Sequence, residues 1–261
     1  MRLATWNILH GKIITKAGAD DALTALAKAI QTLDGDLIGL QEVDHFHPRS
    51  NSVHQTQNAA TAMGAVNWAF APSFFVVGHD ERDIQGSDQL VVTDQDSNEI
   101  PAYGIAIISK VPVLKWERLN LQRARFGKIM RISEGAKSKR FYAKDHARSA
   151  LAAVLSDCIV VNTHLSFVSP FNFFQSREVM RWGERLGKKY QLPVFLMGDF
   201  NLHHGTRFSK WKSLGAGLTF PIWEPDRQID YIMALDEKKS SSKIIALAIS
   251  DHKALVCDLI P

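Results

Sequence analysis

The chain contains only two cysteines in 261 residues, and this scarcity limits how the fold can be held together. Cys158 and Cys257 each lie within an apolar stretch typical of a strand, so we expect two buried free thiols rather than a disulfide. No spacing of cysteines and histidines indicates a zinc site. The core must therefore come from ordinary hydrophobic packing.

Long apolar segments are also missing, since no apolar run approaches the length that crosses a bilayer. Met1 is followed almost at once by a predicted strand over residues 2–7, which leaves no room for a signal peptide. We therefore expect a cytoplasmic protein without a membrane span. No repeat, linker or change of composition divides the chain, so residues 1–261 are expected to form a single domain.

Positive charge is concentrated in one segment, although the net charge of the whole chain is only +4. Residues 115–148 hold eleven lysines and arginines against three acidic residues, an excess of eight positive charges that leaves −4 on the rest. Such a segment is either a contact surface for a polyanion or a solvated loop, and the sequence leaves both interpretations open.

Short apolar runs of strand length dominate the rest of the pattern. Helices are predicted over residues 22–33, capped by Asp20 or Asp21, and over 53–63, 172–189 and 207–214. Strands are predicted over 2–7, 37–40, 66–71, 103–109, 111–119, 149–155, 158–163, 192–197, 229–233, 244–249 and 253–259. Residues 78–101 are expected to form a surface excursion, and 120–147 show no clear period, with a turn near 133–139. This pattern predicts an α+β fold of two face-to-face sheets with helices outside.

Polar residues recur where predicted strands end. After the apolar residues 194–197, Gly198 permits a tight turn, and Asp199 and Asn201 then emerge on the same side of the chain. The other residues in this position are Asn7, Glu42, His164, Asp230, and Asp251 with His252. Each alone is ordinary, because strands end in turns and turns favour Asn and Asp. Together they predict one functional rim.

The chemistry of this predicted rim is that of phosphate-ester hydrolysis. Glu42 and one or more of Asp199 and Asp251, with the Asn7 amide, offer only oxygen ligands, which suit Mg²⁺. A metal beside histidines points to attack of an activated water on a phosphate. Asp199 is the expected base, with Asn201 orienting the water. His252, held cationic by Asp230, would donate to the phosphate.

Seven short motifs occur in an order that resembles a known group of enzymes. They are Thr5-Trp6-Asn7, Leu40-Gln41-Glu42-Val43, Tyr103-Gly104, Asn162-Thr163-His164-Leu165, Gly198-Asp199-Phe200-Asn201, Ile229-Asp230-Tyr231-Ile232 and Ser250-Asp251-His252. In this order they resemble the endonuclease/exonuclease/phosphatase (DNase I-like) superfamily from residue 2 to residue 258. The resemblance implies a four-layered α/β/β/α sandwich and a Mg²⁺- or Mn²⁺-dependent phosphoesterase.

The resemblance also implies roles for individual residues. It makes Glu42 the principal metal ligand, with Asn7 close to it and Asp251 in the metal region. It assigns Asp199 and Asn201 to water activation, the Asp230–His252 pair to the phosphate, and His164 to the phosphate or the leaving oxygen. Arg148 falls where DNase-like members carry a phosphate-contacting arginine. Tyr103, near the place of a glutamate that supports the histidine, and Arg49, in the loop after Glu42, are further candidates for contact with the substrate phosphate.

Sequence motifs that distinguish branches of this superfamily narrow the range of expected substrates. Gln41-Glu42-Val43-Asp44 differs from the Gln-Glu-Thr-Lys of the abasic-endonuclease branch, and Gln228-Ile229-Asp230-Tyr231 differs from the Trp-Cys-Asp-Arg of the inositol 5-phosphatases. We therefore expect a nuclease-like phosphodiesterase acting on nucleic acid, with no stable protein partner. The alternative is a phosphatase or phosphodiesterase acting on a small-molecule or lipid phosphate. A non-catalytic polyanion-binding module is disfavoured, because the metal and base residues are all present.

Four phenylalanines follow His164 and open the longest predicted helix: Phe167, Phe171, Phe173 and Phe174. Stacking on a base, sugar or lipid is one interpretation. Packing of the helix start against a sheet is the favoured one, since aromatic residues at helical spacing usually belong to a core.

Overall fold

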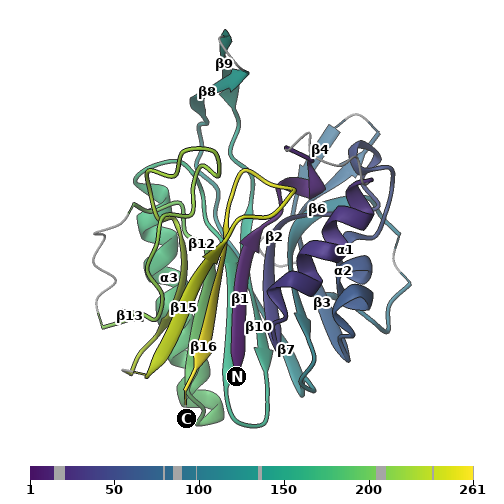
Figure 1. Cartoon of the computed structure of the whole chain (residues 1–261). Helices are drawn as coiled ribbons and strands as arrows, with labels where there is room; N and C mark the ends of the chain where they lie inside the picture. Colours follow the sequence, from purple (N-terminus) through teal and green to yellow (C-terminus); the bar gives the residue numbers. More distant parts are fainter. Residues whose placement is uncertain are drawn as a thin grey trace.

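Two β-sheets stack face to face and helices cover their outer sides (Figure 1). The structure, a computed structural model, describes residues 1–14, 21–78, 80–84, 90–97, 99–134, 137–203, 210–236 and 238–260. This is the four-layered α/β/β/α sandwich that the sequence predicts.

The first sheet contains the N-terminal and C-terminal strands side by side. Its order is β15 (Ser240–Ile245), β16 (Ala254–Leu259), β1 (Arg2–Asn7), β2 (Leu37–His45), β6 (Ala102–Ser109), β3 (Asn67–Val77) and β4 (Asp80–Asp83), with β5 (Val92–Thr93) on β3. Only β1 and β2 pair in parallel; the other neighbours are antiparallel. Parallel pairing brings the carboxyl ends of β1 and β2 to one rim.

The second sheet repeats this arrangement. Its order is β13 (Lys212–Ser213), β14 (Asp230–Ala234), β12 (Val194–Asp199), β11 (Ile159–His164), β10 (Arg148–Val154) and β7 (Lys115–Leu121). Here β11 and β12 form the parallel pair. Their carboxyl ends therefore also lie together, at the same end of the sandwich.

Helices α1 (Ala22–Leu33) and α2 (Gln55–Met63) pack on the first sheet, and α3 (Phe171–Tyr190) packs on the second. The carboxylate of Asp21 caps α1 by accepting the Leu23 and Thr24 N–H groups. Short 3₁₀ turns follow β1 (Leu9–Gly11) and β2 (Pro48–Ser50).

Three apolar layers result from this arrangement. The middle layer lies between the sheets and contains residues such as Leu3, Ile107 and Leu151. Cys158 and Cys257 belong to it as buried free thiols, as expected.

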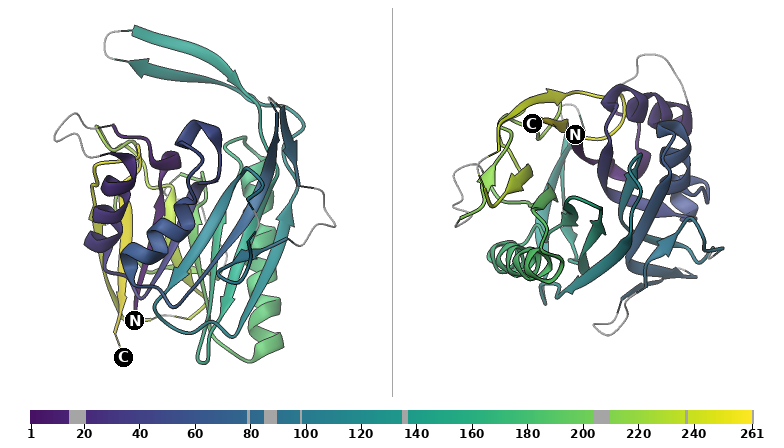
Figure 2. Two further views of the ribbon diagram at one scale, coloured as in Figure 1. Left: turned by 90° about the vertical axis from the view of Figure 1, so that its right-hand side faces the viewer. Right: turned by 90° about the horizontal axis from the view of Figure 1, so that it is seen from below.

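A two-stranded hairpin, β8 (Lys128–Glu134) and β9 (Lys137–Ala143), pairs with neither sheet. It rises above the sandwich in Figure 1 and bends across the top in the left view of Figure 2. The sequence pattern missed both strands, because a ribbon that packs on no core has no alternation of apolar residues to reveal it.

Other differences from the predicted elements are local. Strand β2 continues through a bulge to His45 instead of ending at residue 40, and β3 runs to Val77. The excursion over 78–101 includes the short strands β4 and β5. Residues 207–209 of the predicted helix 207–214 lie outside the described residues, and Lys212–Ser213 form a strand instead. The strand predicted over 244–249 lies at Ser240–Ile245.

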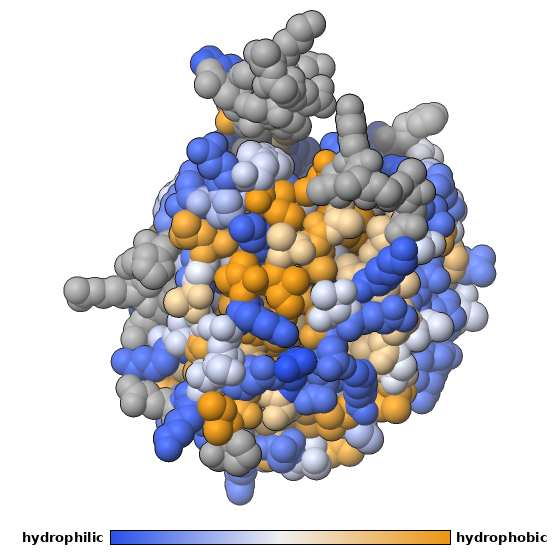
Figure 3. Space-filling model, in the orientation of Figure 1, coloured by the Kyte–Doolittle hydropathy of each residue, from blue (hydrophilic) through white to orange (hydrophobic). Residues whose placement is uncertain are grey.

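The face shown in Figure 1 has a mixed surface. Apolar side chains gather near its middle, and hydrophilic side chains surround them (Figure 3). Among the helices of the described residues, none combines the length and apolar composition needed to cross a bilayer.

Candidate active site

The two parallel strand pairs deliver their polar terminal residues to one rim between the sheets. Strands β1 and β2 contribute Asn7 and Glu42, and β11 and β12 contribute His164 and Asp199. The antiparallel strands begin at this rim, with Arg148 on β10 and Asp230 on β14, and Asp251 and His252 lie just before β16. The structure thus brings the sequence-predicted residues together.

A buried polar bridge joins the sheets directly beneath the rim. The side-chain nitrogen of Gln41 donates to the Asn162 oxygen at 2.6 Å, and the Asn162 nitrogen donates to the carbonyls of Leu40 and Ala106, both at 2.9 Å. Hydrogen bonds in a water-free interior are costly to leave unmade. This bridge therefore fixes how the sheets face each other, and with it the distances in the site above.

Asn7 links carboxylates of the two sheets. Its Nδ2 lies 3.0 Å from Oε1 of Glu42 and 3.1 Å from Oδ2 of Asp199. Its Oδ1 accepts the Leu9 N–H at 3.0 Å, so the amide presents its donor side to the carboxylates. Asn7 thus positions Glu42 and Asp199 instead of offering its oxygen to the centre of the site.

Glu42 occupies the bulge of β2, where the backbone has a φ of 55° and the pairing register shifts. This left-handed conformation is strained for a residue with a side chain. The carboxylate is 22% exposed, and the Nδ1 atom of His10 lies 4.0 Å from Oε2. Burial raises the pKa of Glu42, the Asn7 hydrogen bond opposes this, and nearby Asp251 adds to it.

Asp199 is the centre of the cluster. Its Oδ1 accepts the Asn201 N–H at 2.9 Å, and its Oδ2 lies 3.5 Å from Nε2 of His164 and 3.8 Å from Nε2 of His252. Burial, followed by the charge of Asp230, raises the pKa of Asp199 to about 7. Gly198 precedes it with a φ of 142°, and a Cβ there would collide with the Thr163 carbonyl.

His252 is paired with Asp230 through Nδ1 and Oδ2, 3.0 Å apart. Burial favours the neutral ring, but Asp230 outweighs it, and Asp199 and Asp251 contribute, so the pKa of His252 rises to about 10. The ring is therefore cationic at neutral pH.

His164, in contrast to His252, is neutral. Burial, together with the charges of Arg148 and His252, lowers its pKa well below the usual value, so the ring is neutral. Nη1 of Arg148 lies 3.2 Å from Nδ1 of His164, and because arginine only donates, Nδ1 accepts and Nε2 carries the proton. Arg148 is in turn held by the buried carboxylate of Asp145 at 3.2 Å.

The remaining predicted residues lie around this centre. Nδ2 of Asn201 donates to the Leu165 carbonyl at 3.0 Å, so its amide is engaged with backbone. Arg49 binds the buried Asp44 through two bonds of 2.9 and 2.7 Å and lies over the Tyr103 ring. Burial, followed by the charge of Glu42, raises the pKa of Tyr103. Tyr103 and Arg49 thus flank Glu42.

Some residues of the site were missed by sequence reasoning. Asp145 accepts hydrogen bonds from Arg148, from the Ser166 hydroxyl at 2.8 Å and from the Ala124 N–H at 2.8 Å, and is fully buried. The available signal was an isolated acid three residues before Arg148 in a basic segment. His10, next to Glu42, had no signal, because it lies in an irregular turn.

The residues present fit a divalent cation. Oδ1 of Asp251 is buried and has no hydrogen-bond partner among the described residues, which is costly for a carboxylate without a ligand. Asp199, Asp230 and His252 also offer atoms within 4.8 Å of one another. A protonated His252 offers no lone pair, however, and Glu42 and Asp251 lie outside this group, so the oxygen ligands expected from the sequence do not all meet at one point among the described residues.

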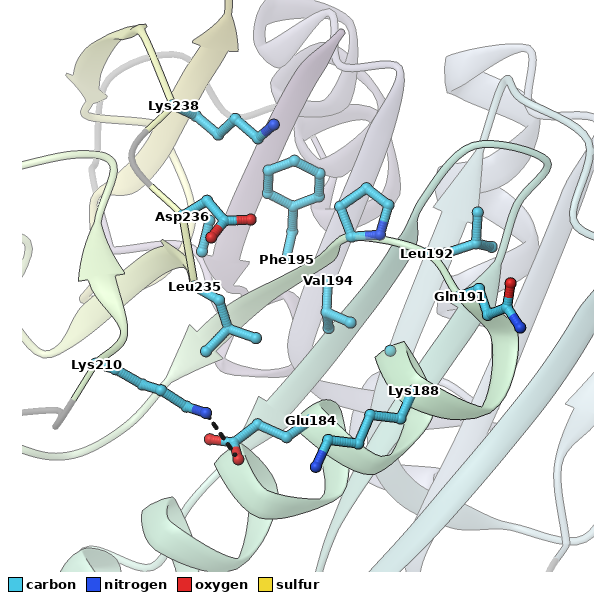
Figure 4. Close-up of a pocket in the computed structure, with 13 residues that line it drawn as sticks. Glu184, Lys188, Gln191, Leu192, Val194, Phe195, Lys210, Leu235, Asp236 and Lys238 are labelled. Carbon is cyan, nitrogen blue, oxygen red and sulfur yellow. Dashed lines mark ion pairs between the residues drawn. The ribbon is translucent and has the colours of Figure 1, made fainter.

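A separate hollow of about 510 Å³ lies at the opposite end of β12 (Figure 4). Val194 and Phe195 contribute to its wall, and the Lys210–Glu184 ion pair of 3.2 Å spans part of its edge. Its charged groups stand apart around the opening, in contrast to the convergent buried groups of the rim. The candidate active site is therefore the rim.

Comparison with known proteins agrees with this architecture. The sequence profile of the Endonuclease/Exonuclease/phosphatase family matches residues 4–252. No curated protein gives a significant match. The structure resembles an endonuclease/exonuclease/phosphatase from Beutenbergia cavernae, with a TM-score of 0.63 and 20% identity over 99% of this chain and 70% of that one.

Two further structures are similar over their whole length or nearly so. A mannosyl-6-phosphatase from Bacteroides thetaiotaomicron has a TM-score of 0.60 and 13% identity, with all of both chains covered. The human Nocturnin catalytic domain, with bound sulfate, has a TM-score of 0.58 and 18% identity over 100% of this chain and 94% of that one. Such identities show a shared fold. Together with the profile match over nearly the whole sequence, they show that this chain belongs to the endonuclease/exonuclease/phosphatase family of hydrolytic phosphoesterases.

Proposed function

We propose that the protein is a divalent-metal-dependent phosphodiesterase that cleaves nucleic acid by attack of an activated water. The observation that carries this proposal is the convergence of Asn7, His164 and His252 on one oxygen of Asp199. A carboxylate surrounded by donors, between a cationic and a neutral histidine, matches what hydrolysis of a phosphodiester needs.

Asp199 is proposed as the general base. A pKa near 7 leaves it partly ionised at neutral pH, which suits a group that must both take up and release a proton. The Asn201 N–H holds Oδ1, and Oδ2 faces the histidines. A water beside Oδ2 would transfer its proton to that atom as its oxygen attacks phosphorus.

The cationic residues are proposed to receive the phosphate. His252 remains charged because Asp230 supports it, and it would donate from Nε2 to an oxygen that gains charge in the transition state. His164 keeps its proton on Nε2 and would donate to a phosphate or leaving oxygen. Arg148, which orients His164, adds a positive charge at the same rim.

Glu42 and Asp251 are the proposed ligands of a Mg²⁺ or Mn²⁺ ion, and Asp199 is kept for the role of base. Bound there, such an ion would neutralise phosphate charge and lower the barrier to attack. The unpartnered Oδ1 of Asp251 supports this placement. Asn7 holds the Glu42 carboxylate in place without offering its own oxygen, which accepts the Leu9 N–H.

The basic segment supports nucleic acid as the substrate. Two of its arginines serve other purposes, since Arg118 is buried and donates to the carbonyls of Leu90 and Pro72, and Arg148 lies in the site. Exposed positive side chains nevertheless cluster at the hairpin and its root: Arg123, Arg125, Lys128, Arg140 and Lys144. The hairpin bends over the end of the sandwich that carries the site (Figure 2), where a polyanion would approach.

A substrate screen tests this proposal. Protein stripped with EDTA is supplied with Mg²⁺, Mn²⁺ or no metal and offered DNA, RNA, p-nitrophenyl phosphate and phospholipids, with Asp199→Asn as the blank. We expect metal-dependent cleavage of nucleic acid that Asp199→Asn abolishes. Cleavage confined to the phosphomonoester or to phospholipids would overturn the nucleic-acid assignment in favour of a small-molecule or lipid phosphate.

A further inference from the structure

The outward face of α3 carries three arginines in a ladder that begins at two exposed aromatic rings. Arg177, Arg181 and Arg185 follow Phe173 at successive intervals of four residues, and all are exposed. Phe174, beside Phe173, is 61% exposed. The favoured expectation that these rings pack the helix start against the sheet is therefore wrong for Phe173 and Phe174.

Folding does not account for this ladder. Like charges four residues apart repel and destabilise a helix. Within the described part of the chain, no acidic residue forms an ion pair with Arg177, Arg181 or Arg185. Lys189, the next residue at this spacing, shows the contrasting case, because Glu117 binds it at 2.7 Å.

The opposite face of α3 supplies the contacts that hold the helix on the sheet. Val179, Trp182 and Leu186 are buried there against the second sheet. The arginine ladder is therefore dispensable for packing. The exposed acidic residue on this face, Glu178, offsets only one of the three arginine charges.

The ladder begins beside the candidate active site. Asn172, in the first turn of α3, donates to the Asn201 carbonyl at 2.8 Å, and Gln175 accepts the Ser166 N–H at 2.7 Å. The Phe171 ring contacts Phe126, at the root of the hairpin, with centroids 6.4 Å apart. The first turn of α3 thus lies next to both the rim and the hairpin root, and the exposed face of the helix begins there.

We propose that this face of α3 binds a single strand of nucleic acid as it enters or leaves the active site, with phosphates on the arginines and an unpaired base on Phe173 or Phe174. The proposal rests on the proposed function and specifies its substrate as single-stranded. Together with Glu178, these side chains border an open hollow of about 630 Å³ on the outer face of the helix.

Spacing and chemistry favour this occupant. Arginines four residues apart repeat about every 6 Å along a helix, which suits a chain of anions better than a single one. Arginine pairs with phosphate through two donors, and aromatic rings stack on bases whose faces are free, as they are in single strands. A bilayer would instead favour apolar side chains along the whole helix, and here they occupy one end.

Binding in EDTA tests the proposal apart from catalysis. The variant Arg177→Gln/Arg181→Gln/Arg185→Gln is compared with Lys238→Gln/Lys239→Gln/Lys243→Gln, which removes the same charge from exposed positions near β15. With a labelled single-stranded oligonucleotide, fluorescence anisotropy should show a loss of at least about tenfold for the arginine variant, and a salt slope smaller by about 2. Equal losses in both variants, or none in the arginine variant, would overturn the proposal.

Two further measurements test whether the phenylalanines stack on bases and whether the face prefers a single strand to a duplex or an anionic membrane. Phe173→Leu/Phe174→Leu should weaken single-strand binding several-fold while leaving the salt slope unchanged, because stacking contributes without charge. Equal affinity of the wild type for duplex, or binding of anionic vesicles that the arginine variant loses while oligonucleotide binding persists, would overturn the assignment to a single strand.

Hydrolysis of bis(p-nitrophenyl) phosphate distinguishes this inference from the function on which it rests. That small diester does not extend along α3, so the arginine variant should cleave it at the wild-type rate. If no diester is cleaved with either metal, the proposed function fails, whereas the binding comparison in EDTA still decides the role of α3.

Discussion

Arg148 and His164 form the contact that sets the proton position in the site, with Nη1 of the arginine 3.2 Å from Nδ1 of the histidine. A guanidinium has no acceptor, so this contact leaves the histidine proton on Nε2, toward Asp199. The carboxylate of Asp145 fixes the arginine from behind. Arg148, a residue of the basic segment, thus orients a side chain of the candidate active site in addition to supplying charge.

Arg148→Lys is expected to lower kcat by about 10²-fold, the effect typical of a misplaced proton donor. A lysine keeps the charge but lacks the planar fork that reaches both Asp145 and His164. The ¹⁵N resonances of the His164 ring should show both tautomers in the variant and one in the wild type. Arg140→Lys, on the exposed hairpin, is the matched control and should cleave a small diester normally.

Asp199→Asn should lower the rate by at least about 10²-fold without destabilising the protein. Burial raises the pKa of Asp199 to about 7, so above that pH the folded state carries a carboxylate that it disfavours. The neutral amide removes that cost. In EDTA at about pH 8, the unfolding midpoint of the variant should equal or exceed that of the wild type. An active variant would refute the assignment of Asp199 as base.

Asp230→Asn should lower the pKa of His252 from about 10 toward the ordinary range. Burial disfavours the cation, and Asp230 is the largest of the charges that sustain it. Titration of the ring by NMR in metal-free protein measures the shift directly, and activity should then decline as the pH rises through the lowered pKa. Asp226→Asn, at an exposed acid, serves as the control. A His252 pKa that stays near 10 would contradict this account.

Replacing residues 128–143 with a short glycine linker should leave the sandwich intact. The hairpin pairs with no other strand of the described residues, and its first and last residues, Lys128 and Ala143, are paired neighbours. We expect the free energy of unfolding to change by less than about 0.5 kcal/mol. Cleavage of a small diester should persist, while KM for nucleic acid rises and depends less on salt. A salt response identical to that of the wild type would argue that the segment is only a solvated ribbon.

His54 should make the protein less stable in mild acid. Its Nδ1 accepts the Gln57 N–H at 3.2 Å as the cap of α2, and burial followed by the charge of His45 lowers its pKa to about 4. The unfolded chain binds this proton near the usual pKa of about 6.5, so stability falls as the pH drops from about 6.5 to about 4.

The contribution of His54, reduced for its partial exposure, is about 1–2 kcal/mol. His54→Asn keeps a cap without a titrating ring, so urea unfolding of this variant should show a smaller loss between about pH 7 and about pH 5. An unchanged pH dependence would assign the acid sensitivity to other groups.

The sequence carried the central elements of the fold because their signals are local. An apolar stripe and the Asp21 cap predict helix α1. A run of apolar residues followed by Gly198 predicts the strand before Asp199. The strand-end residues could be assigned to one rim because neighbouring strands in two stacked sheets end at a shared edge. The order of the motifs along the chain gave the family.

What the sequence did not reveal depends on tertiary contacts. The bulge at Glu42 lets β2 continue to His45, and nothing in the local pattern distinguishes this from a strand end. From the sequence, Asp145 looks like an ordinary acidic residue of a loop. Only the structure shows that it is buried and accepts hydrogen bonds from Arg148 and Ser166. Phe173 and Phe174 stand in an aromatic cluster typical of a core but lie on the exposed side of α3.

The backbone at Glu42 and Asn201 is left-handed, with φ of 55° and 50°. At both positions the side chain is kept at a cost in conformational stability. Glycine would adopt either conformation without the steric penalty of a Cβ. A search for thermostable variants would therefore favour glycine at these sites and would remove the Glu42 carboxylate of the candidate active site and the Asn201 amide that binds the Leu165 carbonyl beside it. Engineering of this protein should hold both positions constant and seek its gains elsewhere.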